Sequence, residues 1–67
     1  MKVAADQRVT ITGVSRRGNS LHIGKRVKVY SVETRAGTDE VETLVLEIPG
    51  NGEMEYHIYS VNSVKVR

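Results

Sequence analysis

Between Val41 and Ile58 the chain reads VETLVLEIPGNGEMEYHI, in which two alternating runs of apolar and polar residues flank a Pro-Gly-Asn-Gly sequence. In the first run, Leu44, Leu46 and Ile48 share one face of an extended chain, because side chains in a β-strand point alternately to its two faces. Pro-Gly and Asn-Gly dipeptides are typical of tight turns. The pattern predicts an antiparallel hairpin, and its first strand is expected to lie inside the sheet rather than at an edge.

Toward the N-terminus, the alternation of Arg8–Val14 predicts another strand, and Arg16–Asn19 (Arg-Arg-Gly-Asn) predicts a tight hairpin turn. The apolar phase then continues from Leu21 to Val29 across Gly24. A glycine inside a strand permits sharp curvature, so we expect one long strand that bends at Gly24. The phase changes near Tyr30, which indicates a β-bulge there.

Toward the C-terminus, Thr34–Glu40 is polar and contains a glycine, so it is expected to form a loop. Ser60–Ser63 is too short for an α-helix and predicts a turn or a single 3₁₀ turn, after which Val64–Val66 forms a brief last strand. Apolar residues nowhere recur at helical spacing over a helical length. The chain is therefore expected to be all-β, with five strands.

This order of strands, hairpins, loop and closing turn resembles SH3-like and Sm-like small barrels, with Tyr56–Val66 similar to their closing portion. The resemblance implies a small five-stranded antiparallel barrel in which the first and last strands pair, and an OB-like barrel is the structural alternative. The expected core consists of the apolar residues of the alternating runs. These are Val9, Ile11, Leu21, Ile23, Val27, Val29, Leu44, Leu46, Ile48, Met54, Tyr56, Ile58, Val64 and Val66.

A narrower resemblance concerns residues 9–24, VTITGVSRRGNSLHIG, which are similar to the central hairpin of the carbon-storage-regulator family of RNA-binding dimers. It covers about a quarter of the chain. Beyond Gly24 the pattern departs, because the helix of that family is absent and strand-like sequence follows. No functional residue is carried over from this likeness.

The size of the chain restricts the classes of function. A chain of 67 residues forms one domain, spanning residues 1–67. So small a core leaves little material for the walls of a closed pocket, which favours binding on an open surface over catalysis. No enzyme activity and no small-molecule cofactor are expected.

The remaining composition indicates where the protein works. There is no cysteine, hence no disulfide framework or thiolate metal site. Residues 1–9 contain no apolar run of the secretory kind, and no stretch has membrane-spanning length, so a cytoplasmic location without a membrane partner is expected.

No residue set suggests catalysis or metal binding. The only histidines, His22 and His57, are each expected on the outer face of a strand without a nearby acidic ligand set, which predicts solvated side chains and no metal site. The acids Asp39, Glu40 and Glu42 lie in or beside a loop, a setting too mobile for acid–base catalysis.

Charge is the most informative feature. Residues 1–32 carry seven basic side chains against one acid, whereas residues 33–67 carry three against seven. Side chains two apart on a strand point the same way about 6.6 Å apart, so a row of them can follow a nucleic-acid backbone. Lys65 and Arg67 can join Arg8 on the same side when the end strands pair. The leading hypothesis is therefore binding of RNA or DNA, through Arg16, Arg17, Lys25, Arg26, Lys28 and Tyr30.

The acidic second half supports the alternative hypothesis, a protein-binding module such as a bacterial or viral regulatory or inhibitory adaptor. Its binding residues would be Glu40, Glu42, Glu53 and Glu55. A domain with one positive and one negative face can also dock copies of itself, which makes a homo-oligomer a further alternative.

Overall fold

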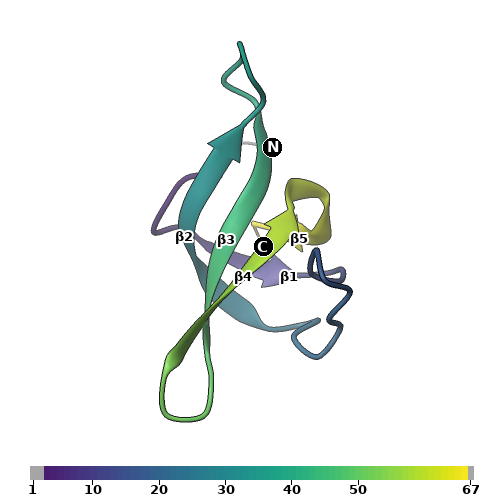
Figure 1. Ribbon diagram of the computed structural model, residues 1–67, viewed down its shortest axis with the longest axis vertical. Helices are drawn as coiled ribbons and strands as arrows, with labels where there is room; N and C mark the ends of the chain where they lie inside the picture. Colours follow the sequence, from purple (N-terminus) through teal and green to yellow (C-terminus); the bar gives the residue numbers. More distant parts are fainter. Residues whose placement is uncertain (1–2, 67) are drawn as a thin grey trace.

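A computed structural model describes residues 3–66 and shows a single antiparallel sheet (Figure 1). Its strands lie side by side in the order β4-β3-β2-β1-β5. The elements are β1 (Arg8–Ile11), β2 (Arg26–Thr34), β3 (Val41–Pro49), β4 (Met54–Ser60), the 3₁₀ helix η1 (Val61–Ser63) and β5 (Val64–Lys65). Within residues 3–66, no helix has the length and apolar character needed to cross a membrane.

The sheet is open, with β4 and β5 as its two edges. Figure 1 shows β2 and β3 as a long twisted pair along the major axis of a molecule that measures 38 × 22 × 19 Å. The predicted all-β architecture of five antiparallel strands and the pairing of the first and last strands are confirmed. Closure of the sheet into a barrel is not.

One face of the sheet forms the core, because small proteins gain most of their stability from burying apolar area. Val27 lies opposite Val9, Leu46 opposite Val29, and Tyr59 opposite Leu44. The buried cluster consists of Val3, Val9, Ile11, Val27, Val29, Leu44, Leu46, Ile48, Tyr59 and Val64, with Val66 packed against it.

Several local predictions are confirmed. The register between β2 and β3 shifts between Val29 and Ser31, which is the bulge expected near Tyr30. Residues 35–40 form the expected loop, residues 50–53 connect the β3–β4 hairpin, and η1 precedes the short last strand. These segments carry strong turn chemistry, so local sequence was sufficient to place them.

The strand predicted from Leu21 is wrong in its first part. Residues 21–24 form a turn, and β2 begins only at Arg26. Gly24 has a φ of 92°, which an extended strand residue does not adopt, and its amide donates to the carbonyl of Ile11 at 2.7 Å. Leu21 and Ile23 therefore lie outside the core, with Leu21 80% exposed. The tight turn at Arg16–Asn19 does form, with Gly18 N donating to Ser15 O at 2.8 Å, but it lies inside a long loop, residues 12–25.

The phase predicted for β4 is also wrong. The apolar residues Met54, Tyr56 and Ile58 face outward and are exposed, while His57 and Tyr59 face the same side as the core. A shift of one residue moves every side chain of a strand to the other face. Both faces of this strand carry large apolar residues, Tyr56 and Ile58 on one and Tyr59 on the other. The strand buries the face of Tyr59, which lies opposite the buried Leu44.

We predict that Leu46→Ala lowers the free energy of unfolding by about 2–5 kcal/mol, because it removes a fully buried side chain. The matched variant Leu21→Ala should change it by less than about 0.5 kcal/mol, because Leu21 is exposed. Urea denaturation followed by circular dichroism measures both. Equal losses in the two variants would contradict the strand assignment.

Tyr59 gives a second prediction. Its ring is fully buried, its hydroxyl oxygen has no hydrogen-bond partner among residues 3–66, and burial raises the pKa of the hydroxyl above 10.0. Above about pH 10 the Tyr59 hydroxyl ionises in the unfolded chain but stays protonated in the folded chain. Ionisation therefore favours the unfolded state, and the free energy of unfolding falls as the pH rises from about 10 through the folded-state pKa. Tyr59→Phe should match or exceed wild-type stability near neutral pH, since no bond is lost, and should lose less stability at high pH. Urea denaturation at about pH 8 and about pH 10.5 tests this, and identical pH dependence in both proteins would refute it.

Candidate nucleic-acid interface

Basic side chains gather on the outward face of β1, β2 and β5, and we call this set the basic face. Arg8 lies directly opposite Lys28, and Thr10 lies opposite both Arg26 and Lys65. Because Val9, Val27 and Val64 point into the core, these neighbours point outward. The basic face consists of Arg8, Arg26, Lys28 and Lys65.

The sequence predictions for this region are met in part. Arg26 and Lys28 share the outward face of β2 as expected, and Lys65 lies on the same side as Arg8. Lys25 is exposed immediately before β2 begins. Arg67, expected to join this side, lies outside the described residues.

Some charges of the basic face are already paired with acidic side chains, and others are free to contact a ligand. Lys28 Nζ lies 3.6 Å from an Asp6 carboxylate oxygen and 3.5 Å from one of Glu47, whose side chain is only 18% exposed. Arg26 donates a hydrogen bond to the Thr10 hydroxyl oxygen at 3.2 Å. Within residues 3–66, Arg8, Arg26 and Lys65 form no ion pair, so they carry the charge available to a ligand.

An aromatic pair stands beside the basic face. Tyr30, in the bulge of β2, and Tyr56, on β4, are 55% and 52% exposed, and their ring centroids are 4.8 Å apart at 60°. Glu47 of β3 lies opposite Tyr56 in the register, so the two rings meet across the intervening strand. The sequence pattern predicted Tyr30 at the interface but Tyr56 in the core, because alternation alone does not reveal which face of β4 is buried.

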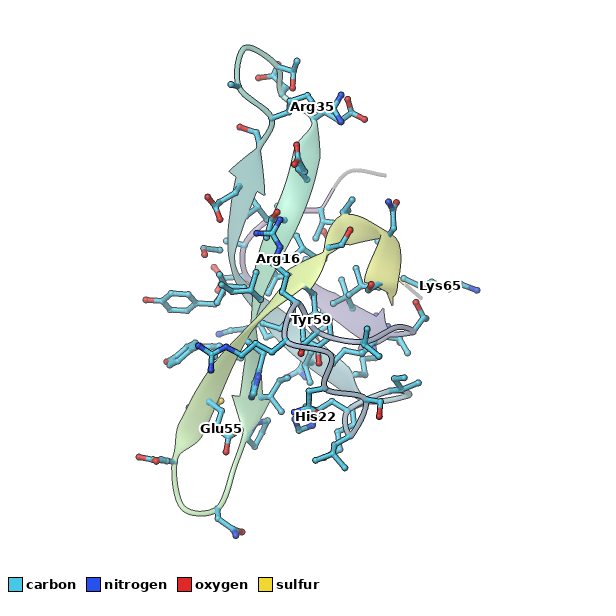
Figure 2. The ribbon with its side chains drawn as sticks, turned by 45° about the vertical axis from the view of Figure 1, so that its right-hand side comes forward. Arg16, His22, Arg35, Glu55, Tyr59 and Lys65 are labelled. Carbon is cyan, nitrogen blue, oxygen red and sulfur yellow. The ribbon has the colours of Figure 1, made fainter. Side chains whose placement is uncertain are left out.

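Arg16 and Arg17 lie on the other side of this aromatic pair. The loop of residues 12–25 reaches β4, where the Arg16 amide donates to the Ile58 carbonyl at 2.8 Å, and Figure 2 shows Arg16 against this strand. The loop and strand together form a groove. It is lined by Ser15, Arg16, Arg17, Asn19, Tyr56, His57 and Ile58. The neighbourhood of Arg16 and Tyr56 depends on a contact between distant parts of the chain, which local patterns do not predict.

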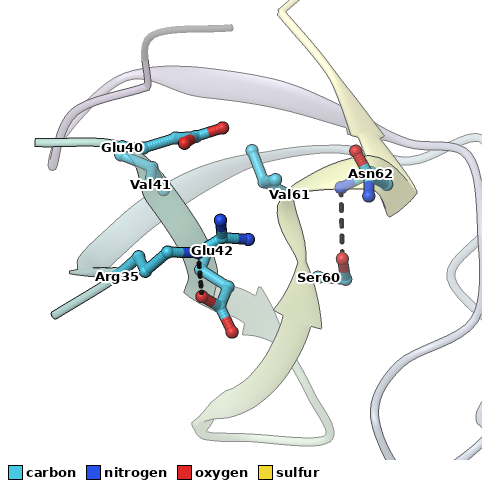
Figure 3. A pocket seen from close by; sticks show the side chains of 7 residues that line it. All are labelled: Arg35, Glu40, Val41, Glu42, Ser60, Val61 and Asn62. Atoms are coloured by element: carbon cyan, nitrogen blue, oxygen red, sulfur yellow. Dashed lines mark hydrogen bonds and ion pairs between the residues drawn. The ribbon is translucent and has the colours of Figure 1, made fainter. Parts of the chain in front are cut away.

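The acidic residues of the alternative hypothesis divide into two groups. Glu40 and Glu42 lie at the start of β3, where Arg35 Nε is 3.4 Å from a Glu42 carboxylate oxygen in a small polar pocket (Figure 3). Glu53 and Glu55 lie at the far end of the same strand, beside the β3–β4 turn. They are thus separated by the length of β3 and do not form one acidic surface.

The histidines are not on outer strand faces as predicted. His22 belongs to the turn at residues 21–24, and its ring centroid lies 5.3 Å from that of His57. His57 Nε2 and Glu55 Oε1 are 2.9 Å apart. The two misplacements have different origins, because residues 21–24 form a turn and not a strand, whereas β4 is a strand of the opposite phase.

No family model, curated protein or solved structure matches the chain.

Proposed function

We propose that the protein binds single-stranded RNA or DNA across the outward side of its sheet, without catalysis. The observation that carries the proposal is the exposed Tyr30–Tyr56 pair, which has basic side chains on both sides. Aromatic side chains stack on unpaired bases, and Arg and Lys side chains contact the phosphates between them. Bases in a duplex are already stacked, so this arrangement favours a single strand.

The order of side chains across the sheet fits an extended ligand. Neighbouring strands lie about 4.8 Å apart, so β1 and β4 are separated by about 14 Å. Over this width a ligand would meet Arg8 and Arg26 first, then the tyrosine pair, then Arg16 and Arg17 at the groove. A segment of a few nucleotides spans such a distance, and the sheet of an RNA-recognition domain stacks two or three bases in a similar way.

We further infer that the open, twisted sheet is an incompletely closed small barrel of SH3-like or Sm-like character, and that the protein acts as a regulator in the cytoplasm. The support is the strand order, in which β1 lies between β5 and β2, together with the 3₁₀ turn before the last strand. The loop of residues 12–25 contacts β4 through Arg16 and η1 through Thr12 and Gly13, and so lies at the open side between the edge strands. The OB-like alternative lacks comparable support.

The protein-binding alternative has less support from the geometry. The four glutamates proposed for it lie at two ends of β3, and two of them have partners, Glu42 with Arg35 and Glu55 with His57. An acidic surface for a basic partner would need these charges together.

Fluorescence anisotropy with labelled single-stranded and duplex oligonucleotides at two salt concentrations tests the proposal. We expect single strands to bind more tightly than duplex, with a logarithmic salt slope of about −0.7 for each phosphate contacted. The double variant Arg16→Ala, Arg17→Ala should flatten this slope by about 1.4, and Arg26→Ala by about 0.7. Tyr30→Ala should weaken single-strand binding by about 1–3 kcal/mol.

Arg35→Ala is the matched control for Arg26→Ala, because it removes the same charge from an exposed arginine at the far end of the molecule (Figure 2). It should leave the slope unchanged. Absence of binding at low salt, or the same effect of both single variants, would refute the proposed interface. A pull-down that returns the same protein with and without nuclease would support the protein-binding alternative instead.

A further inference from the structure

Three side chains capable of ligating a metal converge between the loop of residues 12–25 and β4. They are His22, Glu55 and His57, and one potential ligand atom from each lies within 4.8 Å of the other two. Glu55 and His57 are two residues apart on β4, so they point to the same face of that strand. His22 approaches from the turn at residues 21–24, and Figure 2 shows where its loop and Glu55 lie.

One of the three side chains, that of His22, also has a buried nitrogen, Nδ1, without a hydrogen-bond partner among residues 3–66. A buried nitrogen without a partner is rare in folded proteins, and the lone pair of a neutral imidazole is a ready metal ligand. Beside it, His57 Nε2 and Glu55 Oε1 already lie 2.9 Å apart.

The backbone leaves room for the carboxylate. Gly50 stands against the Glu55 side chain, and a Cβ atom at residue 50 would overlap the Glu55 carboxylate. A larger residue at position 50 would therefore require the Glu55 carboxylate to move. The Glu55 carboxylate thus lies between the β3–β4 turn and His57.

We propose that His22, Glu55 and His57 bind one first-row transition-metal dication of the Zn²⁺ type. Two imidazoles and one carboxylate are a common zinc ligand set, with a fourth position for water or another ligand. Bonds of about 2.0–2.2 Å in a tetrahedron place ligand atoms about 3.3 Å apart. The pair from Glu55 and His57 is already near this separation, so binding requires a small approach of His22.

Such an ion would join the loop of residues 12–25 to β4. The described contacts between them include the Arg16–Ile58 hydrogen bond and the packing of the two histidine rings. The chain contains no cysteine, so no disulfide performs this task. The inference uses none of the arginine and lysine side chains of the proposed interface, although His57 also lines the groove, and it is tested with the metal alone.

Isothermal titration calorimetry with ZnCl₂, on chelator-treated protein without a histidine tag, tests the proposal. We expect one Zn²⁺ per chain, with affinity reduced at least tenfold in His22→Ala and in Glu55→Gln. Glu53→Gln is the matched control, because it makes the same chemical change two residues earlier, and it should bind as wild type does. Absence of binding to wild-type protein would overturn the proposal.

A second measurement uses only the unmodified protein, so it tests the site even if the variants fail to fold. In NMR spectra recorded during the Zn²⁺ titration, the ring signals of His22 and His57 should change together and saturate at one equivalent. A response of only one ring, or a response without saturation, would overturn the shared site. Co²⁺ added to the metal-free protein should give the visible absorption of a tetrahedral complex and should be displaced by Zn²⁺, and an octahedral spectrum would contradict the proposed geometry.

Discussion

The structure depends on the burial of one face of a single sheet. Leu44, Leu46 and Ile48 of β3 are fully buried and pack with valines of β1 and β2, because within residues 3–66 no second sheet or α-helix covers that face. A sheet of this size can enclose its own apolar face only by twisting strongly, and the bulge at Tyr30 adds to the twist. The outward side is then left for charge, and the long first loop lies beside β4. The basic face and the histidine cluster follow from this arrangement.

Prediction from sequence succeeded where one phase of alternation was clearly more apolar than the other. In β3 only one face can hold the run ending at Ile48, and the turn after it is specified by proline and glycine. In β4 the two phases compete, since Ile58 and Tyr56 belong to one and Tyr59 to the other. Tyr59 is buried opposite Leu44, and that pairing between strands is not visible in the β4 sequence alone.

In the candidate sites, too, residues placed by the alternation of one strand were predicted, whereas contacts between distant segments were not. Arg26 and Lys28 were placed correctly because they alternate with buried valines on one strand. Alternation through Leu21 suggested a strand, but the positive φ of Gly24 makes a turn, and His22 is thereby carried to His57. The groove and the three-ligand cluster both require the loop of residues 12–25 to contact β4. No local pattern specifies that contact, because it joins segments more than thirty residues apart.

The position of this loop is thus the claim on which the site assignments rest. A nuclear Overhauser spectrum of the protein measures it most directly, because protons within about 5 Å give cross-peaks whatever the binding partner. The structure predicts cross-peaks between the ring protons of His22 and His57, whose centroids are 5.3 Å apart, and none between the methyl groups of Leu21 and Leu46, since one is exposed and the other buried. Cross-peaks from Leu21 to Leu46, with none between the histidine rings, would contradict the account and restore the bent strand.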